Sequence, residues 1–374
     1  MTANTALQLL LGLTALILGA QFLVKGASKL ALALGISPLI VGLTVVAFGT
    51  SAPELAVSAQ SALSGQTNVV LGNVVGSNIY NVLFILGLCA LITPLVVAPQ
   101  LIRIDVPIMI GASLVLYLLA LDGTISRADG ALLAAGIAAY ILFVIRQARR
   151  ERQAVQEAYA DELKGSIKPD RRYWLHALFI VIGLVFLGLG SDWLVEGAVA
   201  VATAFKLSPL LIGMTVVTVG TTAPEMTACL VASARGEKDI AVGNIVGSNI
   251  FNILAVLGTG GVLSPTGIPV DATMIGFGLP VMVAVAVACL PVFFTGAAIR
   301  RWEGAMFVTY FCVYTSYLVL EAMKNEASGT VRVVVIWLML PLTMVTLGTS
   351  TWREWKKRKG GELPSMKNRN LNPS

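Results

Sequence analysis

Ionisable side chains are scarce in this chain of 374 residues. Only 12% of its residues are charged, whereas 56% are apolar and the mean hydropathy is +0.83. In water-soluble domains roughly a quarter of the residues are charged. The composition therefore excludes a soluble protein. At about 20 residues for each membrane span, the length allows about ten or eleven spans and leaves no room for a large soluble enzyme.

Cysteine and histidine are also rare. The only histidine, His176, stands at the start of an apolar run and is expected to anchor a helix at the membrane surface. Cysteines inside apolar runs with no CxxC spacing are typical of buried small hydrophobic residues. These counts argue against a disulfide framework, a thiolate metal site and histidine-based catalysis. The four cysteines are Cys89, Cys229, Cys289 and Cys312.

Long apolar runs between turn and charge signals predict an all-α polytopic membrane protein. The first run has no Lys or Arg before Lys25, the reverse of a secretory signal peptide, so we expect it to be retained as a helix. The predicted spans are residues 6–33, 38–63, 69–92, 103–121, 129–147, 174–204, 209–233, 240–263, 272–296, 303–321 and 331–350.

The basic residues predict how these spans are oriented. With the N-terminus outside, 22 of the 26 Lys and Arg residues fall on the inner side and four on the outer side. Such a bias indicates an odd number of spans with the C-terminus in the cytoplasm, and we expect the plasma (inner) membrane. The net charge of +6 therefore reflects topology signals rather than a surface for nucleic acid.

Two segments repeat at a constant offset of 171 residues. SPLIVGLTVVAFGTSAPE begins at Ser37 and SPLLIGMTVVTVGTTAPE at Ser208, with 12 of 18 positions identical. GNVVGSNIYN begins at Gly72 and GNIVGSNIFN at Gly243. Over residues 37–87 the identities total 24 of 51, so the chain contains a duplicated unit.

The duplication is predicted to be inverted, because five spans separate equivalent points and an odd number reverses the direction across the membrane. Inverted repeats with ion sites near the bilayer midplane are typical of secondary transporters. The predicted organisation is a first repeat of five spans in 1–148, a cytoplasmic linker in 149–172, a second repeat of five spans in 173–322, and an eleventh helix with a basic tail in 323–374.

Two carboxylates lie within apolar helices, Glu54 and Glu225, both in the repeated GT(S/T)APE motif. A carboxylate at bilayer depth is costly and by default marks an ion path or pairs with a buried base. No Lys or Arg lies deep in any predicted span, so we favour the ion path. Pro53 and Pro224 should break each helix and free the carbonyls of Gly49 and Gly220. Hydroxyls at Thr50, Ser51, Thr221 and Thr222 stand beside them.

The second motif places two polar residues on one helical face, because they are four positions apart. In both copies they could either join helices or coordinate an ion. We favour coordination for these serines and asparagines, whereas for Asn78 and Asn249 both interpretations stay open. The pairs are Ser77 with Asn81 and Ser248 with Asn252.

The resulting ligand set contains carboxylate, hydroxyl, amide and backbone oxygens. Such a hard, all-oxygen site suits Ca²⁺ or Na⁺ and not Zn²⁺ or Cu⁺, and Mg²⁺ is disfavoured because it dehydrates reluctantly. Two negative charges match one Ca²⁺ or two to three Na⁺. Binding of Ca²⁺ would therefore exclude Na⁺ and the reverse, as antiport requires. These ions are substrates, and no cofactor is expected.

Both motifs, in both halves, resemble the alpha repeats of the calcium/cation antiporter superfamily, and most closely its bacterial and archaeal sodium/calcium exchanger branch. The resemblance covers residues 6–321. It implies ten core helices in two inverted five-helix repeats, and the predicted eleventh C-terminal helix lies outside that core. Spans 2, 3, 7 and 8 would hold the ions while spans 1 and 6 slide against them.

The same resemblance implies a ligand for each matching position. Glu54 and Glu225 would bind both Ca²⁺ and Na⁺, and the remaining ligands would be the carbonyls of Ala47, Thr50, Thr218 and Thr221, the side chains of Ser51, Ser77, Thr222 and Ser248, and the amides of Asn81 and Asn252. Many relatives carry Asp where this chain has Asn252. Its absence argues against K⁺ transport.

The favoured function is therefore electrogenic exchange of Ca²⁺ for Na⁺ by alternating access. A proton-coupled antiporter is the first alternative, although that branch has an acidic residue where this chain has Gly76 and Gly247. A passive cation channel is the second alternative. An intramembrane enzyme is disfavoured, because the sequence contains no HExxH or GxSxG motif. The sequence does not determine the oligomeric state.

Overall fold

The computed structural model describes residues 3–159, 172–204 and 218–323, together with residues 329, 348, 352 and 356. Parts of the predicted linker, the start of the predicted span at 209–233, the predicted helix at 331–350 and most of the C-terminal tail therefore lie outside the described residues.

The first half of the described chain is almost entirely helical, as its apolar runs predict. Several helices contain π-helical segments, labelled η like the 3-10 turn η4. Its elements are α1 (Ala3–Leu34), α2 (Pro38–Val41), η1 (Gly42–Val46), α3 (Ala47–Thr50), α4 (Ala52–Leu63), α5 (Thr67–Tyr80), η2 (Asn81–Leu86), α6 (Gly87–Ile92), β1 (Leu95–Val96), η3 (Leu101–Asp105), α7 (Val106–Leu119), η4 (Ala120–Asp122), β2 (Thr124–Ile125) and α8 (Arg127–Tyr159).

In its described residues the second half follows the same order of elements, with no counterpart of η4. Its elements are α9 (Tyr173–Ala204), α11 (Thr218–Thr221), α12 (Ala223–Ala234), α13 (Lys238–Phe251), η6 (Asn252–Leu257), α14 (Gly258–Leu263), β3 (Ile268–Pro269), η7 (Met274–Gly278), α15 (Leu279–Phe294), β4 (Ala298–Ile299) and α16 (Arg301–Ala322).

Eight helical segments of the described chain are long and apolar enough to cross a membrane, and a ninth is the bent pair Pro38–Thr50 and Ala52–Leu63. The all-α membrane fold predicted from the sequence is confirmed. The exact count of ten core helices and an eleventh stays a prediction. The helix α8 runs on from the predicted span into the linker as far as Tyr159.

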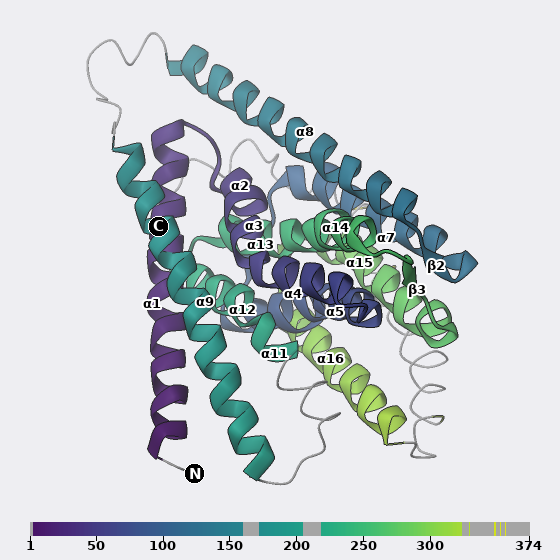
Figure 1. The fold of residues 1–374 in the computed structure, drawn as a ribbon. Helices are drawn as coiled ribbons and strands as arrows, with labels where there is room; N and C mark the ends of the chain where they lie inside the picture. The colour runs from purple at the N-terminus through teal and green to yellow at the C-terminus, as the bar shows by residue number, and fades with distance from the viewer. Residues whose placement is uncertain are drawn as a thin grey trace.

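Helices α1 and α9 pack along their whole length, at one side of the molecule in Figure 1. Glycines at every seventh position make this possible, because a Cβ atom on Gly19 would lie 2.8 Å from the carbonyl oxygen of Gly183. A Cβ atom on Gly12 would lie 2.9 Å from the carbonyl oxygen of Gly190. At the 171-residue offset Gly19 corresponds to Gly190, and Gly12 corresponds to Gly183. The two contacts are therefore equivalent, as a two-fold relation between the halves requires.

Two short strand pairs also join the halves. Leu95 in β1 pairs with Ile299 in β4, and Ile125 in β2 pairs with Ile268 in β3, both antiparallel. Each pair brings a loop of the first half to the same end of the molecule as a loop of the second half. This arrangement is the one that an inverted duplication produces.

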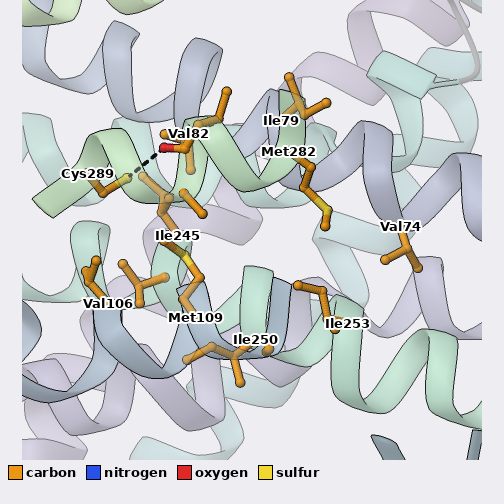
Figure 2. Packing of buried hydrophobic residues seen from close by; sticks show 14 of the residues in the cluster. Val74, Ile79, Val82, Val106, Met109, Ile245, Ile250, Ile253, Met282 and Cys289 are labelled. Atoms are coloured by element: carbon orange, nitrogen blue, oxygen red, sulfur yellow. Dashed lines mark hydrogen bonds between the residues drawn. The ribbon is translucent and has the colours of Figure 1, made fainter. Parts of the chain in front are cut away.

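The central core is built from α5, α7, α13 and α15. Figure 2 shows Val74 and Ile79 of α5 near Met282 of α15, with Met109 of α7 near Ile250 of α13. Three of the four cysteines are buried as predicted, whereas Cys312 on α16 is exposed. His176 is buried against α1, with 3% of its surface exposed, and its predicted place at the membrane surface stays a prediction.

Candidate functional site

Each repeated GT(S/T)APE motif contains a break between two helices. The helix α3 ends at Thr50 and α4 begins at Ala52, and the segments Pro38–Thr50 and Ala52–Leu63 are bent by 44°. At the equivalent place α11 ends at Thr221 and α12 begins at Ala223. The proline that follows each break lacks the N–H of a continuous helix, so the predicted interruption is confirmed.

The two motif carboxylates are buried at the starts of α4 and α12, and each is 1% exposed. The hydroxyl of Ser51 donates a hydrogen bond of 2.9 Å to Oε1 of Glu225, and this bond joins the two halves. Within the described part of the chain, the other three carboxylate oxygens of Glu54 and Glu225 have no hydrogen-bond partner. Buried carboxylate oxygens without donors favour a bound cation.

The predicted hydroxyls and carbonyls are unevenly engaged. Thr50 donates through its hydroxyl to Oδ1 of Asn244 at 3.2 Å, and the carbonyl of Ala47 accepts from the N–H of Ser51 at 3.1 Å. The carbonyl of Gly220 was expected to be free of hydrogen bonds, but it accepts one from the hydroxyl of Ser191 on α9.

Two further asparagines support the carboxylate helices, and the sequence interpretation missed them. Asn73 donates to the hydroxyl of Ser58 at 3.1 Å and to the carbonyl of Glu54 at 3.5 Å. Asn244 donates to the sulfur of Cys229 at 3.1 Å. Both asparagines follow the first glycine of the GN motif at the 171-residue offset, and this match was the available signal.

The second motif brings its polar residues to the same region. Ser77 and Ser248 are fully buried, and Ser77 donates to Oδ1 of Asn73 at 3.5 Å. Among the described residues, the hydroxyl of Ser248 has no hydrogen-bond partner. Asn81 and Asn252 are at most 1% exposed and begin the π-helical segments η2 and η6, which often occur at functional sites.

Comparison with known proteins identifies this arrangement. A family model described as "Sodium/calcium exchanger protein" matches residues 4–147 and 175–320, one match for each half. The chain belongs to this family. It is accordingly a membrane transporter and not an enzyme, and its general activity is antiport of cations including Ca²⁺.

Individual relatives of this exchanger-family chain cover most of its length. CaxA of Alkalimonas amylolytica is 39% identical over 259 residues, which are 68% of this chain and 79% of CaxA. The sodium/calcium exchanger MaX1 of Methanosarcina acetivorans is 31% identical over 350 residues, covering 83% of this chain and 97% of MaX1.

A solved structure of the sodium-calcium exchanger NCX_Mj, soaked with 2.5 mM Na⁺ and 0.1 mM Ca²⁺, has the same fold. Its TM-score is 0.72 at 27% identity, over 84% of this chain and 99% of that chain. The family resemblance inferred from the two motifs is therefore confirmed.

Within this exchanger fold, the predicted ligand positions lie on the two broken helices and on the two helices that cross them. The described side chains at these positions are buried, except that of Thr221, which is half-buried. Thr218 begins α11, and its side chain lies outside the described residues. In the described residues no group of three or more His, Cys, Asp and Glu side chains is placed to hold a metal ion.

Proposed function

We propose that this chain exchanges Ca²⁺ for Na⁺ across the plasma (inner) membrane, without K⁺ and with net movement of charge. The observation that carries the proposal is the pair of buried carboxylates, Glu54 and Glu225, with three of four oxygens lacking a partner among the described residues. One Ca²⁺ or several Na⁺ would neutralise this pair, because both ions prefer oxygen ligands. Exchange with three Na⁺ would move one net charge in each cycle.

The proposed ligands are arranged around these two carboxylates. Side-chain oxygens would come from Ser51, Ser77, Asn81, Thr222, Ser248 and Asn252, and main-chain oxygens from Ala47, Thr50, Thr218 and Thr221. The burial of the described side chains supports this set. A cation held there would meet few waters, and its charge would then be balanced by the protein.

Alternating access would use the glycine seam between α1 and α9. The two helices form a pair whose mutual contacts are close, whereas the proposed ligands lie on other helices. The pair could therefore move as one body against the ligand helices. We also propose that repeats occupy 1–148 and 173–322, that 149–172 is a cytoplasmic linker and 323–374 adds a helix and tail, and that the N-terminus is outside.

The test is Na⁺-driven uptake of ⁴⁵Ca²⁺ into proteoliposomes loaded with Na⁺. Glu54→Gln and Glu225→Gln should each reduce exchange to background, because each removes one of the two negative charges that a cation must neutralise. Glu196→Gln is the matched control, since Glu196 is exposed on α9 and makes its hydrogen bond with Gln8.

Four outcomes would contradict parts of this proposal. Exchange retained in both site variants would remove the ligand assignment. Uptake driven by a pH gradient and indifferent to Na⁺ would favour proton-coupled antiport. Flux that needs no counter-ion would indicate a channel, and a requirement for K⁺ would overturn K⁺ independence.

A further inference from the structure

Asn78 and Asn249 occupy equivalent positions on α5 and α13, where these two helices cross. The side-chain amide of Asn78 donates to the main-chain carbonyl of Asn249 at 3.3 Å, and the amide of Asn249 donates to the main-chain carbonyl of Asn78 at 3.4 Å. Each amide nitrogen also lies near a methionine sulfur, that of Met282 at 3.7 Å or Met109 at 3.5 Å. The two bonds form a reciprocal clasp between the halves.

The clasp fixes which end of each amide faces which way. A main-chain carbonyl can only accept, so the NH₂ group of each clasp asparagine must point at it, and the side-chain oxygen must point elsewhere. These oxygens accept two further bonds in a crossed pattern. Asn81 donates to Oδ1 of Asn249 at 3.0 Å, and Asn252 donates to Oδ1 of Asn78 at 3.2 Å.

The crossed bonds in turn orient Asn81 and Asn252. If either amide rotated by 180°, its oxygen would face another oxygen at about the same separation, and the bond would be replaced by repulsion. The NH₂ groups are therefore held toward the clasp and both Oδ1 atoms away from it. In the described residues these two Oδ1 atoms have no hydrogen-bond partner, although Asn81 is fully buried and Asn252 is 1% exposed.

We infer that Asn78 and Asn249 are positioning residues that hold the amide oxygens, rather than the amide NH₂ groups, of Asn252 and Asn81 toward the transported cation. The inference rests on the proposed function for the identity of the cation. A rotated amide would present positively polarised hydrogens to a cation and oppose its binding. Neither clasp asparagine needs to touch the ion, and this answers the question that the sequence left open for them.

The crossed pattern makes the inference testable, because Asn78 orients Asn252 while Asn249 orients Asn81. Asn78→Leu removes the acceptor for Asn252 and keeps a side chain of similar size. Loss of such a supporting partner typically weakens metal binding by about 10- to 100-fold. We expect Asn78→Leu to raise the Kd for Ca²⁺ by about tenfold, measured as equilibrium ⁴⁵Ca²⁺ binding to the purified full chain.

A carboxylate removes the dependence on orientation, because its two oxygens are equivalent. Asn78→Leu should therefore raise the Kd about tenfold when residue 252 is Asn, and by less than about twofold in the background of Asn252→Asp. In the background of Asn81→Asp, Asn78→Leu should keep its full effect, since Asn81 is held by Asn249. The reciprocal cycle with Asn249→Leu should couple to Asn81→Asp and not to Asn252→Asp.

Equal effects of Asn78→Leu in all three backgrounds would overturn the inference and leave the clasp as helix packing alone. So would an unchanged Kd in Asn78→Leu. If Asn78→Leu fails to fold, Asn78→Asp serves instead, since it keeps an acceptor for Asn252. Asn78→Asp should change the Kd of the unmodified chain only slightly. In the background of Asn81→Asp, Asn249→Asp should change the Kd more. Because binding is measured without Na⁺, a chain that binds Ca²⁺ but does not exchange it would contradict the proposed function and still decide this inference.

Discussion

The two halves of the molecule carry the same motifs but do not surround their carboxylates in the same way. Glu225 in the second half receives a hydrogen bond from Ser51, which comes from the first half. Within the described residues, neither oxygen of Glu54 has such a partner. In the first half Asn73 donates a hydrogen bond to the hydroxyl of Ser58, whereas in the second half Asn244 donates one to the sulfur of Cys229.

This comparison separates what the duplication preserves from what has diverged. The helix breaks, the π-helical segments that begin at Asn81 and Asn252, and the asparagine clasp are the same in both halves. The groups behind the carboxylates differ. The shared features should thus respond equally to equivalent substitutions in the two halves, and the divergent ones should respond unequally.

The largest effect is expected at the glycine seam, where the halves should behave alike. A Cβ atom on Gly183 would lie 2.5 Å from the backbone nitrogen of Leu23, and one on Gly12, its equivalent in the first half, would lie 2.8 Å from the backbone nitrogen of Leu194. Backbone cannot move aside as a side chain can. Gly183→Ala and Gly12→Ala should each slow Na⁺-driven ⁴⁵Ca²⁺ exchange by more than about tenfold, because about 1.4 kcal/mol of strain suffices for that factor.

Gly188→Ala is the control on the same helix, since a Cβ atom there meets nothing within 4 Å. It should exchange at the unmodified rate. Equilibrium Ca²⁺ binding should survive in all three variants, because the proposed ligands lie on other helices. If Gly183→Ala slows exchange and Gly12→Ala does not, the seam is not equivalent in the two halves.

The next effect is expected at Ser51, whose hydroxyl bonds to Glu225 across the two halves. A hydrogen bond to a charged group contributes about 1.5–3 kcal/mol. Because this bond holds the Glu225 carboxylate in place and the Ser51 hydroxyl is itself a proposed ligand, Ser51→Ala should raise the Kd for Ca²⁺ by about tenfold or more. Ser51→Thr, which installs the residue that the second half carries at position 222, keeps the hydroxyl and should stay within about threefold of the unmodified chain. Both values come from ⁴⁵Ca²⁺ binding, and equal losses in the two variants would show that the hydroxyl is not what matters.

The sequence was sufficient to predict the features that depend on residue type at short range. Apolar runs predicted the spans, because a helix must satisfy its own backbone in lipid. Pro53 and Pro224 predicted the breaks, since proline lacks the N–H that the helix needs. Glu54 and Glu225 stood out because carboxylates are costly at that depth.

Features that depend on how helices are rotated against each other could not be predicted. The crossed bonds of Asn81 to Asn249 and of Asn252 to Asn78 require the rotation of α5 and α13 about their axes, which a repeat offset does not give. The carbonyl of Gly220 was expected to be bare, but Ser191 lies 29 positions away in sequence and reaches it only through packing. Strands of two residues, such as β1, are too short for any alternation to reveal.

The smallest effect should distinguish the two supporting asparagines. Asn244 is buried with 1% of its surface exposed, whereas Asn73 is half-buried. Cys229→Ala would leave the amide of Asn244 without its acceptor in a buried place, and such a loss costs about 1–3 kcal/mol. Ser58→Ala should cost less, because Asn73 keeps its contact with the carbonyl of Glu54 and is partly accessible. Cys229→Ser restores an acceptor and should recover most of the loss.

Thermal unfolding of the three variants in one detergent measures the difference. A greater loss in Ser58→Ala than in Cys229→Ala would mean that burial does not control the strength of these supports, and that the first half is the more tightly constrained one.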